Sequence, residues 1–148
     1  MSAGWFMRAA DHGHADAAFK LANAHKLGLG IPQNIEQALA LYQNASSNGS
    51  SEAAYALGRI YRLGDGVRRD YPKALKWLRV SADKGFAPAE HELGQLYQEG
   101  IALPRDIETA KHWLSKAASK GHAPARFDLA RLLLDGDIAS RQNGFAIL

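Results

Sequence analysis

A strict repeat of 36 residues constrains this chain more than any other feature of its sequence. Glycine occupies two positions of the repeat, and alanine and leucine occupy three others, without a slip of one residue. The glycines are Gly13, Gly49, Gly85 and Gly121, and Gly28, Gly64, Gly100 and Gly136. The other positions hold Ala17, Ala53, Ala89 and Ala125; Leu21, Leu57, Leu93 and Leu129; and Ala38, Ala74, Ala110 and Ala146. Self-similarity at such a period is typical of repeat architectures.

Within one period the sequence predicts two helices. Apolar and small residues follow helical spacing from Ala89 to Tyr97, and a second stripe runs from Ile107 to Ala118. We therefore expect first helices near 14–27, 50–63, 86–99 and 122–135, and second helices near 2–11, 34–47, 70–83, 106–119 and 141–148.

The connecting residues are typical of helix ends. Asn34, Asp70 and Asp106 stand where they can cap the second helices. The glycines from Gly13 onward suit the left-handed residue after a second helix. Pro88 suits the first turn of the next helix, where a missing N–H costs nothing. The turns are therefore short, and successive helices lie antiparallel.

Such helix pairs bury their apolar faces only by stacking on one another. We expect an all-α fold, a right-handed α/α solenoid of about four helix-turn-helix repeats. One repeat domain spans 1–148, with a second helix at 1–12, repeats at 13–48, 49–84 and 85–120, and an incomplete repeat at 121–148. Neither end is a polar cap, so we expect a fragment of a longer array or self-association through the uncapped ends.

Residues 53–85, AAYALGRIYRLGDGVRRDYPKALKWLRVSADKG, resemble the Sel-one-like repeat, a longer relative of the tetratricopeptide repeat. The segments AEHELGQLYQEG and ARFDLARLLLDG resemble it too. The second loop glycine, present as Gly30 and Gly66, is replaced by Ala102 and Ile138. The resemblance implies a scaffold or adaptor for other proteins without naming the ligand.

By analogy with tetratricopeptide solenoids, the first helices line a concave groove. The residues of these helices that face away from the packed stripe form what we call the groove stripe: in each copy, a ring is followed by basic or amide groups. The groove stripe comprises Phe19, Asn23, Lys26, Tyr55, Arg59, Arg62, His91, Gln95, Gln98, Phe127 and Arg131.

Rings and arginines are the usual anchors of interfaces, and arginine can hold a carboxylate with two hydrogen bonds. The groove stripe therefore predicts a partner peptide or protein, with a preference for an acidic or C-terminal segment. In the competing interpretation the rings pack between neighbouring first helices and the arginines are solvated. The fold analogy alone does not decide between them.

Most residue patterns that suggest a catalytic or metal site lack a residue that such a site needs. The chain has no cysteine, which excludes disulfides, thiolate metal sites and cysteine nucleophiles. His12 and His14 lack a third metal ligand, and the loop GDGVRRD lacks the acids of a calcium site. His91 lies between Glu90 and Glu92, but neighbours in a helix point away from one another. We expect no enzymatic activity, no metal and no cofactor.

The charge and hydropathy of the chain argue against nucleic acid as a partner and against a membrane-spanning segment. Lysine and arginine exceed aspartate and glutamate by only 18 − 15 = 3. The basic residues from Arg68 to Arg79 are diluted by nearby aspartates, which favours a solvated face over nucleic-acid binding. No apolar run is long enough to span a membrane. Since no export signal is recognisable, we expect the cytoplasm by default, or a periplasmic or secreted protein if a signal peptide was removed.

The sequence thus predicts a protein–protein interaction scaffold or adaptor that binds a peptide or partner in the groove. The alternative is a regulatory or targeting repeat domain of a larger enzyme or envelope-assembly protein.

Overall fold

The computed structural model describes the backbone of residues 15–101 and 103–147, and side chains up to residue 136. Within these ranges the chain forms seven helices and no strand. They are α2 (Ala15–Leu27), α3 (Ile35–Ser47), α4 (Ser51–Leu63), α5 (Tyr71–Asp83), α6 (Ala87–Glu99), α7 (Ile107–Ser119) and α8 (Ala123–Ile147). The prediction of an all-α repeat fold is confirmed, whereas the helix expected at 1–12 lies outside the described residues.

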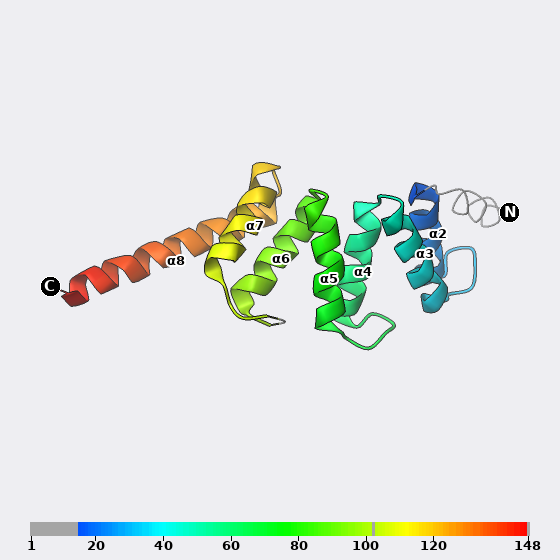
Figure 1. Cartoon of the computed structure of the whole chain (residues 1–148), viewed down its shortest axis with the longest axis horizontal. Helices are drawn as coiled ribbons and strands as arrows, with labels where there is room; N and C mark the ends of the chain where they lie inside the picture. The colour runs from blue at the N-terminus through cyan, green and yellow to red at the C-terminus, as the bar shows by residue number, and fades with distance from the viewer. Residues whose placement is uncertain (1–14, 102, 148) are drawn as a thin grey trace.

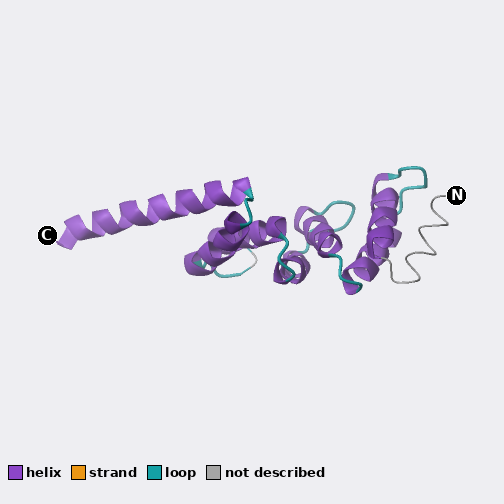
Figure 2. Ribbon diagram, turned by 90° about the horizontal axis from the view of Figure 1, so that it is seen from above, coloured by secondary structure: helices purple, strands orange, loops and turns teal. Residues whose placement is uncertain are grey.

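The helices form antiparallel pairs that follow one another along the long axis of the molecule (Figure 1). Helix α2 packs on α3, α4 on α5 and α6 on α7, and each pair also contacts the next through α3 and α4, α5 and α6, or α7 and α8. Figure 2 shows only helices and connecting loops, with α8 extending from the last pair. The even-numbered helices are the first helices of the repeats, and the odd-numbered ones are the second helices.

The helix ends are set by the residues expected to set them. Asn34, Asp70 and Asp106 have extended backbones, and each side chain accepts a hydrogen bond of 3.1 Å from the backbone N–H three residues later. Gly64 and Gly100 end α4 and α6 in the left-handed conformation. These local signals therefore position each turn before any tertiary contact is considered.

The core lies where small side chains let the two helices of a repeat approach. A Cβ added to Gly94 would lie 2.7 Å from Cγ of Leu114, and one added to Gly58 would lie equally close to Leu78. Leucines then fill the space between successive pairs, each contributing about 1.5–3 kcal/mol through burial. The buried repeat positions are Ala38, Ala74 and Ala110; Ala53, Ala89 and Ala125; and Leu21, Leu57 and Leu93.

One expectation, the turn near Gly136, is wrong. Instead of separate helices near 122–135 and 141–148, α8 continues without a break from Ala123 to Ile147. Gly136 is not among the glycines with a positive φ. The position that holds the N-caps of α3, α5 and α7 holds Gln142 in the last copy. Glutamine is a poor N-cap, so the sequence provides no signal to start a new helix there.

Candidate functional site

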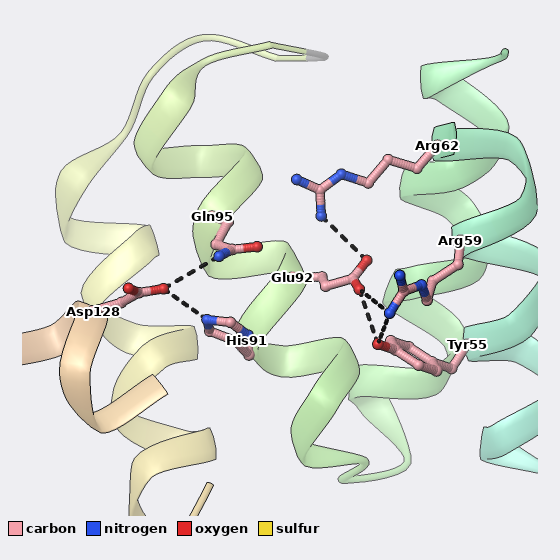
Figure 3. Close-up of polar contacts among 7 residues, drawn as sticks. All are labelled: Tyr55, Arg59, Arg62, His91, Glu92, Gln95 and Asp128. Atoms are coloured by element: carbon pink, nitrogen blue, oxygen red, sulfur yellow. Dashed lines mark hydrogen bonds and ion pairs between the residues drawn. The ribbon is translucent and has the colours of Figure 1, made fainter. Parts of the chain in front are cut away.

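The groove stripe lies on the even-numbered helices, and most of its polar members make contacts between neighbouring repeats. Figure 3 shows that Tyr55, Arg59 and Arg62 of α4 point toward Glu92 of α6. His91 and Gln95 of α6 point away from that cluster, toward Asp128 of α8. Two carboxylates that the sequence reasoning did not include in the stripe therefore organise it.

Glu92 holds the first cluster together. The Tyr55 hydroxyl donates to Oε1 of Glu92 at 2.9 Å, and Arg62 Nη1 donates to Oε2 at 3.2 Å. Arg59 Nη1 donates to the Tyr55 hydroxyl at 3.1 Å and lies 3.5 Å from Oε1 of Glu92. The Glu92 side chain is nearly buried. Both arginines are thus paired with a carboxylate of this chain, an outcome that neither interpretation of the sequence anticipated.

Asp128 repeats this arrangement one interface later. His91 Nε2 lies 2.7 Å from Oδ2 of Asp128, and the Gln95 amide donates to the same oxygen at 3.2 Å. The partners keep the register of the first cluster: His91 occupies the position of Tyr55, and Asp128 occupies the position of Glu92. An acid on one first helix is therefore received by the stripe of the preceding first helix at two successive interfaces.

The first interface, between α2 and α4, differs because the position of the acid holds Ala56. Here the Tyr42 hydroxyl of α3 donates to Oδ1 of Asn23, and Lys26 Nζ lies 3.2 Å from Oδ2 of Asp65. The Phe19 ring packs at a tilt on the Tyr42 ring, with centroids 5.9 Å apart. The stripe residues of α2 are therefore held by their own repeat and by the loop that follows α4.

A pocket of about 530 Å³ opens at this interface. Its volume lies in the range of sites that bind small molecules or side chains of a partner. The lining is mainly apolar and aromatic, with two acids and two bases. It consists of Phe19, Asn23, Lys26, Tyr42, Glu52, Tyr55, Ala56, Arg59, Ile60, Leu63, Asp65 and Phe86.

The remaining members of the stripe do not join these clusters. Phe127 on α8 is 64% exposed, and the Arg131 guanidinium lies over its ring at 5.7 Å. Gln98 is half-buried and makes no side-chain hydrogen bond to another residue that the structure describes. The stripe therefore forms paired clusters in the middle, a pocket at α2 and α4, and an exposed ring on α8.

The electrostatics of the pocket favour neutral hydroxyl donors. Burial, with a smaller effect of Asp65, raises the pKa of Tyr42 to about 12. Burial also raises the pKa of Tyr55 above its ordinary value. The hydrogen bond with Tyr55 is the main reason that the pKa of Arg59 is raised. At neutral pH the pocket thus presents two uncharged phenols beside a charged guanidinium.

The pair of His91 and Asp128 has two of the parts of a hydrolytic triad, and the third is not found among the residues that the structure describes. The neighbouring ring is His122, with a centroid 5.1 Å away, and burial lowers the pKa of His122. Among the described residues no hydroxyl hydrogen-bonds to His91, and no group of three or more potential metal ligands occurs. The arrangement supports a structural role for the pair. His12 and His14 lie outside the described residues.

A second buried acid, Glu90, also escaped the sequence reasoning. Both of its carboxylate oxygens lie 2.8 Å from Nζ of Lys120, which also donates to the Gly85 carbonyl at 2.9 Å. Lys84, one repeat earlier, donates in the same way to the Ser46 carbonyl at 3.0 Å. Lysine recurs at this position of the repeat as Lys84 and Lys120. This recurrence is the sequence signal that could have indicated the contact. His91, Glu90 and Glu92 do point to different partners, as the helical geometry predicted.

The basic residues that follow Gly66 are exposed, as expected of a solvated face. Lys73 and Lys76 lie over the rings of Tyr61 and Trp77, which shows how their stems cover aromatic surface. None of the described helices is both long and apolar enough to cross a membrane.

The chain is similar in sequence and fold to known repeat proteins. The Sel1 repeat profile matches residues 15–50, 51–86 and 87–122. A Sel1 repeat protein from Oxalobacter formigenes is 32% identical, with a TM-score of 0.79, over 85% of this chain and 95% of that one. A protective antigen of uropathogenic Escherichia coli with the SLR fold is 29% identical, with a TM-score of 0.80, over 90% of this chain and 29% of that one.

A third solved structure, an immunity protein from Pseudomonas aeruginosa, is 30% identical, with a TM-score of 0.58. The match covers 86% of this chain and 48% of that one. No curated protein sequence matches the chain significantly.

The three matched repeats run without a gap and cover most of the chain. Proteins built from this repeat are generally scaffolds for protein–protein interaction, and the repeat itself is generally not catalytic. The three matched segments follow one another at the 36-residue step of the sequence. The chain belongs to the Sel1 repeat family.

Proposed function

We propose that this chain is a non-catalytic interaction module that binds an extended segment of a partner protein across the pocket between α2 and α4. The observation that carries the proposal is the coincidence of this pocket with the groove stripe. Phe19, Asn23, Lys26, Tyr55 and Arg59 were selected from the repeat pattern alone, and all five line the pocket.

The composition of the pocket supports a peptide as the ligand. Aromatic rings provide rigid contact area at low entropic cost, and such residues dominate the energetics of interfaces. Leu63 at the end of α4 is 55% exposed and lines the pocket, so a partner that buries it gains hydrophobic free energy. The paired clusters at Glu92 and Asp128 keep neighbouring repeats in register, which gives the pocket a rigid wall.

Of the basic residues in the groove stripe, fewer are available to an acid of the partner than the sequence alone indicates. Arg59 and Arg62 already contact Glu92, so they are poor candidates for an additional carboxylate. The same pairing makes charge reversal of these arginines an unsuitable test, because it would also break the contact between α4 and α6. Lys26 is the basic lining residue whose partner, Asp65, is itself exposed.

A pair of leucines in equivalent positions provides a cleaner test. Leu63 and Leu27 end successive first helices and are 55% and 61% exposed, but only Leu63 lines the pocket. A partner is first captured from native lysate and purified, and its affinity for Leu63→Asp and Leu27→Asp is then compared with wild type by calorimetry. We expect Leu63→Asp to weaken binding by about tenfold or more, while Leu27→Asp binds like wild type. Equal affinities of both variants and wild type would refute the proposed site.

A further inference from the structure

At two of the three interfaces between first helices, a carboxylate of the following helix enters the stripe of the preceding one. Glu92 is received by Tyr55, Arg59 and Arg62, and Asp128 is received by His91 and Gln95. Glu92 and Asp128 occupy the same position of the repeat, so these contacts reflect a property of the interface. Each stripe is built to receive one carboxylate.

At the interface of α2 and α4, Asn23 and Lys26 provide donors at two of the three receiving positions and Phe19 stands at the third, but the carboxylate is missing. The position equivalent to Glu92 holds Ala56, which lines the pocket together with Asn23 and Lys26. The Asn23 amide oxygen accepts from Tyr42, while its amide nitrogen makes no hydrogen bond to any residue that the structure describes. Lys26 pairs with the exposed Asp65, and ion pairs with an exposed partner are weak. Both groups can therefore turn to an incoming acceptor at little cost.

We propose that a carboxylate of the partner peptide occupies the place left by Ala56, where Asn23 and Lys26 donate to it. This assignment rests on the proposed function and names the chemical group that the pocket selects. The rest of the pocket is apolar, so a residue next to the acid packs against Phe19, Ile60 and Leu63. A wholly apolar ligand would cover the Asn23 amide N–H without giving it a partner, which is unfavourable.

Two acidic residues of the pocket limit the number of carboxylates that a bound peptide can carry. Glu52 and Asp65 are pocket residues, and they repel a second or third carboxylate. The preferred segment therefore carries a single Asp, Glu or C-terminal carboxylate flanked by apolar residues. A run of acids is disfavoured.

The repeat supplies an internal competitor for the test. Ala56→Glu places a carboxylate of the chain where Glu92 and Asp128 stand in the later copies, so it fills the site from within. Ala40→Glu on α3 makes the same change in charge at an exposed position that does not line the pocket. A displayed library of random peptides, with free C-termini, is selected against the wild-type protein. Affinities of the enriched peptides are then measured for wild type and both variants.

We expect the binding of every enriched peptide that Leu63→Asp weakens to depend on a single carboxylate, an Asp or Glu side chain or the C-terminus, that stands beside an apolar residue. The Glu→Gln or amidated form of such a peptide should bind wild type about tenfold or more weakly, a comparison that needs no protein variant. Ala56→Glu should cause a similar loss, and Ala40→Glu should cause none. Peptides that lose affinity with Leu63→Asp but bind wild type equally well after all their carboxylates are neutralised (Asp→Asn, Glu→Gln and C-terminal amidation), or that bind Ala56→Glu as well as wild type, overturn the inference and leave the proposed function standing. If no enriched peptide responds to Leu63→Asp, and no captured partner does, both are wrong.

Discussion

Replacing Lys120 by methionine should destabilise the fold, because it leaves the buried carboxylate of Glu90 unpaired. The change in the free energy of unfolding then measures the cost of that unpaired charge. The Glu90 side chain has no exposed surface, and both of its oxygens lie 2.8 Å from Nζ of Lys120. No other side chain in the described part of the protein hydrogen-bonds to that carboxylate. Breaking a buried pair from one side costs about 3–5 kcal/mol.

The loss of stability should be smaller when Glu90 is replaced than when Lys120 is replaced. Lys120 is 41% exposed, so in Glu90→Gln its ammonium group is still solvated, and we expect a loss of only about 1–2 kcal/mol. The double variant should be more stable than Lys120→Met alone, because a buried amide is less costly than a buried charge. Against a total stability of about 5–15 kcal/mol for a domain, the difference is easily resolved.

Lys84 provides the matched control. It occupies the same position one repeat earlier and donates to the Ser46 carbonyl, but the position of Glu90 there holds Ala54. Lys84→Met should therefore cost about 1 kcal/mol or less. The assay is guanidinium unfolding at neutral pH followed by far-UV circular dichroism. The reasoning is refuted if Lys120→Met costs no more than Lys84→Met or Glu90→Gln.

Three further predictions concern packing, backbone and titration. Gly94→Ala should destabilise by about 1–2 kcal/mol in urea unfolding, because the added Cβ meets Leu114 at 2.7 Å; a gain in stability would contradict this packing. Gly100→Ala should cost more than Gly121→Ala, since both have left-handed backbones but only the first Cβ meets a neighbour, Arg105, at 2.9 Å; equal thermal shifts would contradict the clash. With a pKa raised from 10.0 to about 12, Tyr42 stabilises the fold fully below pH 10 and loses that contribution as pH rises toward 12. The absorbance of tyrosinate in wild type should show a late phase that Tyr42→Phe lacks, and an unchanged titration curve would count against its burial.

The sequence was sufficient for the fold because its signals are local and repeated. Asn34, Asp70 and Asp106 cap helices through their own side chains, three residues from the bond they make. The same locality explains the error at Gly136, where the repeat predicted a turn but Gln142 provides no cap to begin another helix.

The site was only half predictable because its contacts cross between repeats. The stripe residues lie on the first helices, yet the paired acids Glu92 and Asp128 lie on the next repeat, and helical spacing within one repeat carries no information about them. Complementary groups at Tyr55 and Glu92, and again at His91 and Asp128, have the same separation along the chain. A search for such recurring pairs across one period would have found both clusters.

Hydrogen exchange of the protein with and without a purified partner tests the central claim most directly, since it maps the bound surface without any substitution. Binding across the pocket should slow exchange of the amides in α2 and in the second half of α4, which carry Asn23, Lys26 and Leu63. The second helices α5 and α7 should exchange as in the free protein. Protection confined to α5 and α7, with α2 and α4 unchanged, would contradict the account.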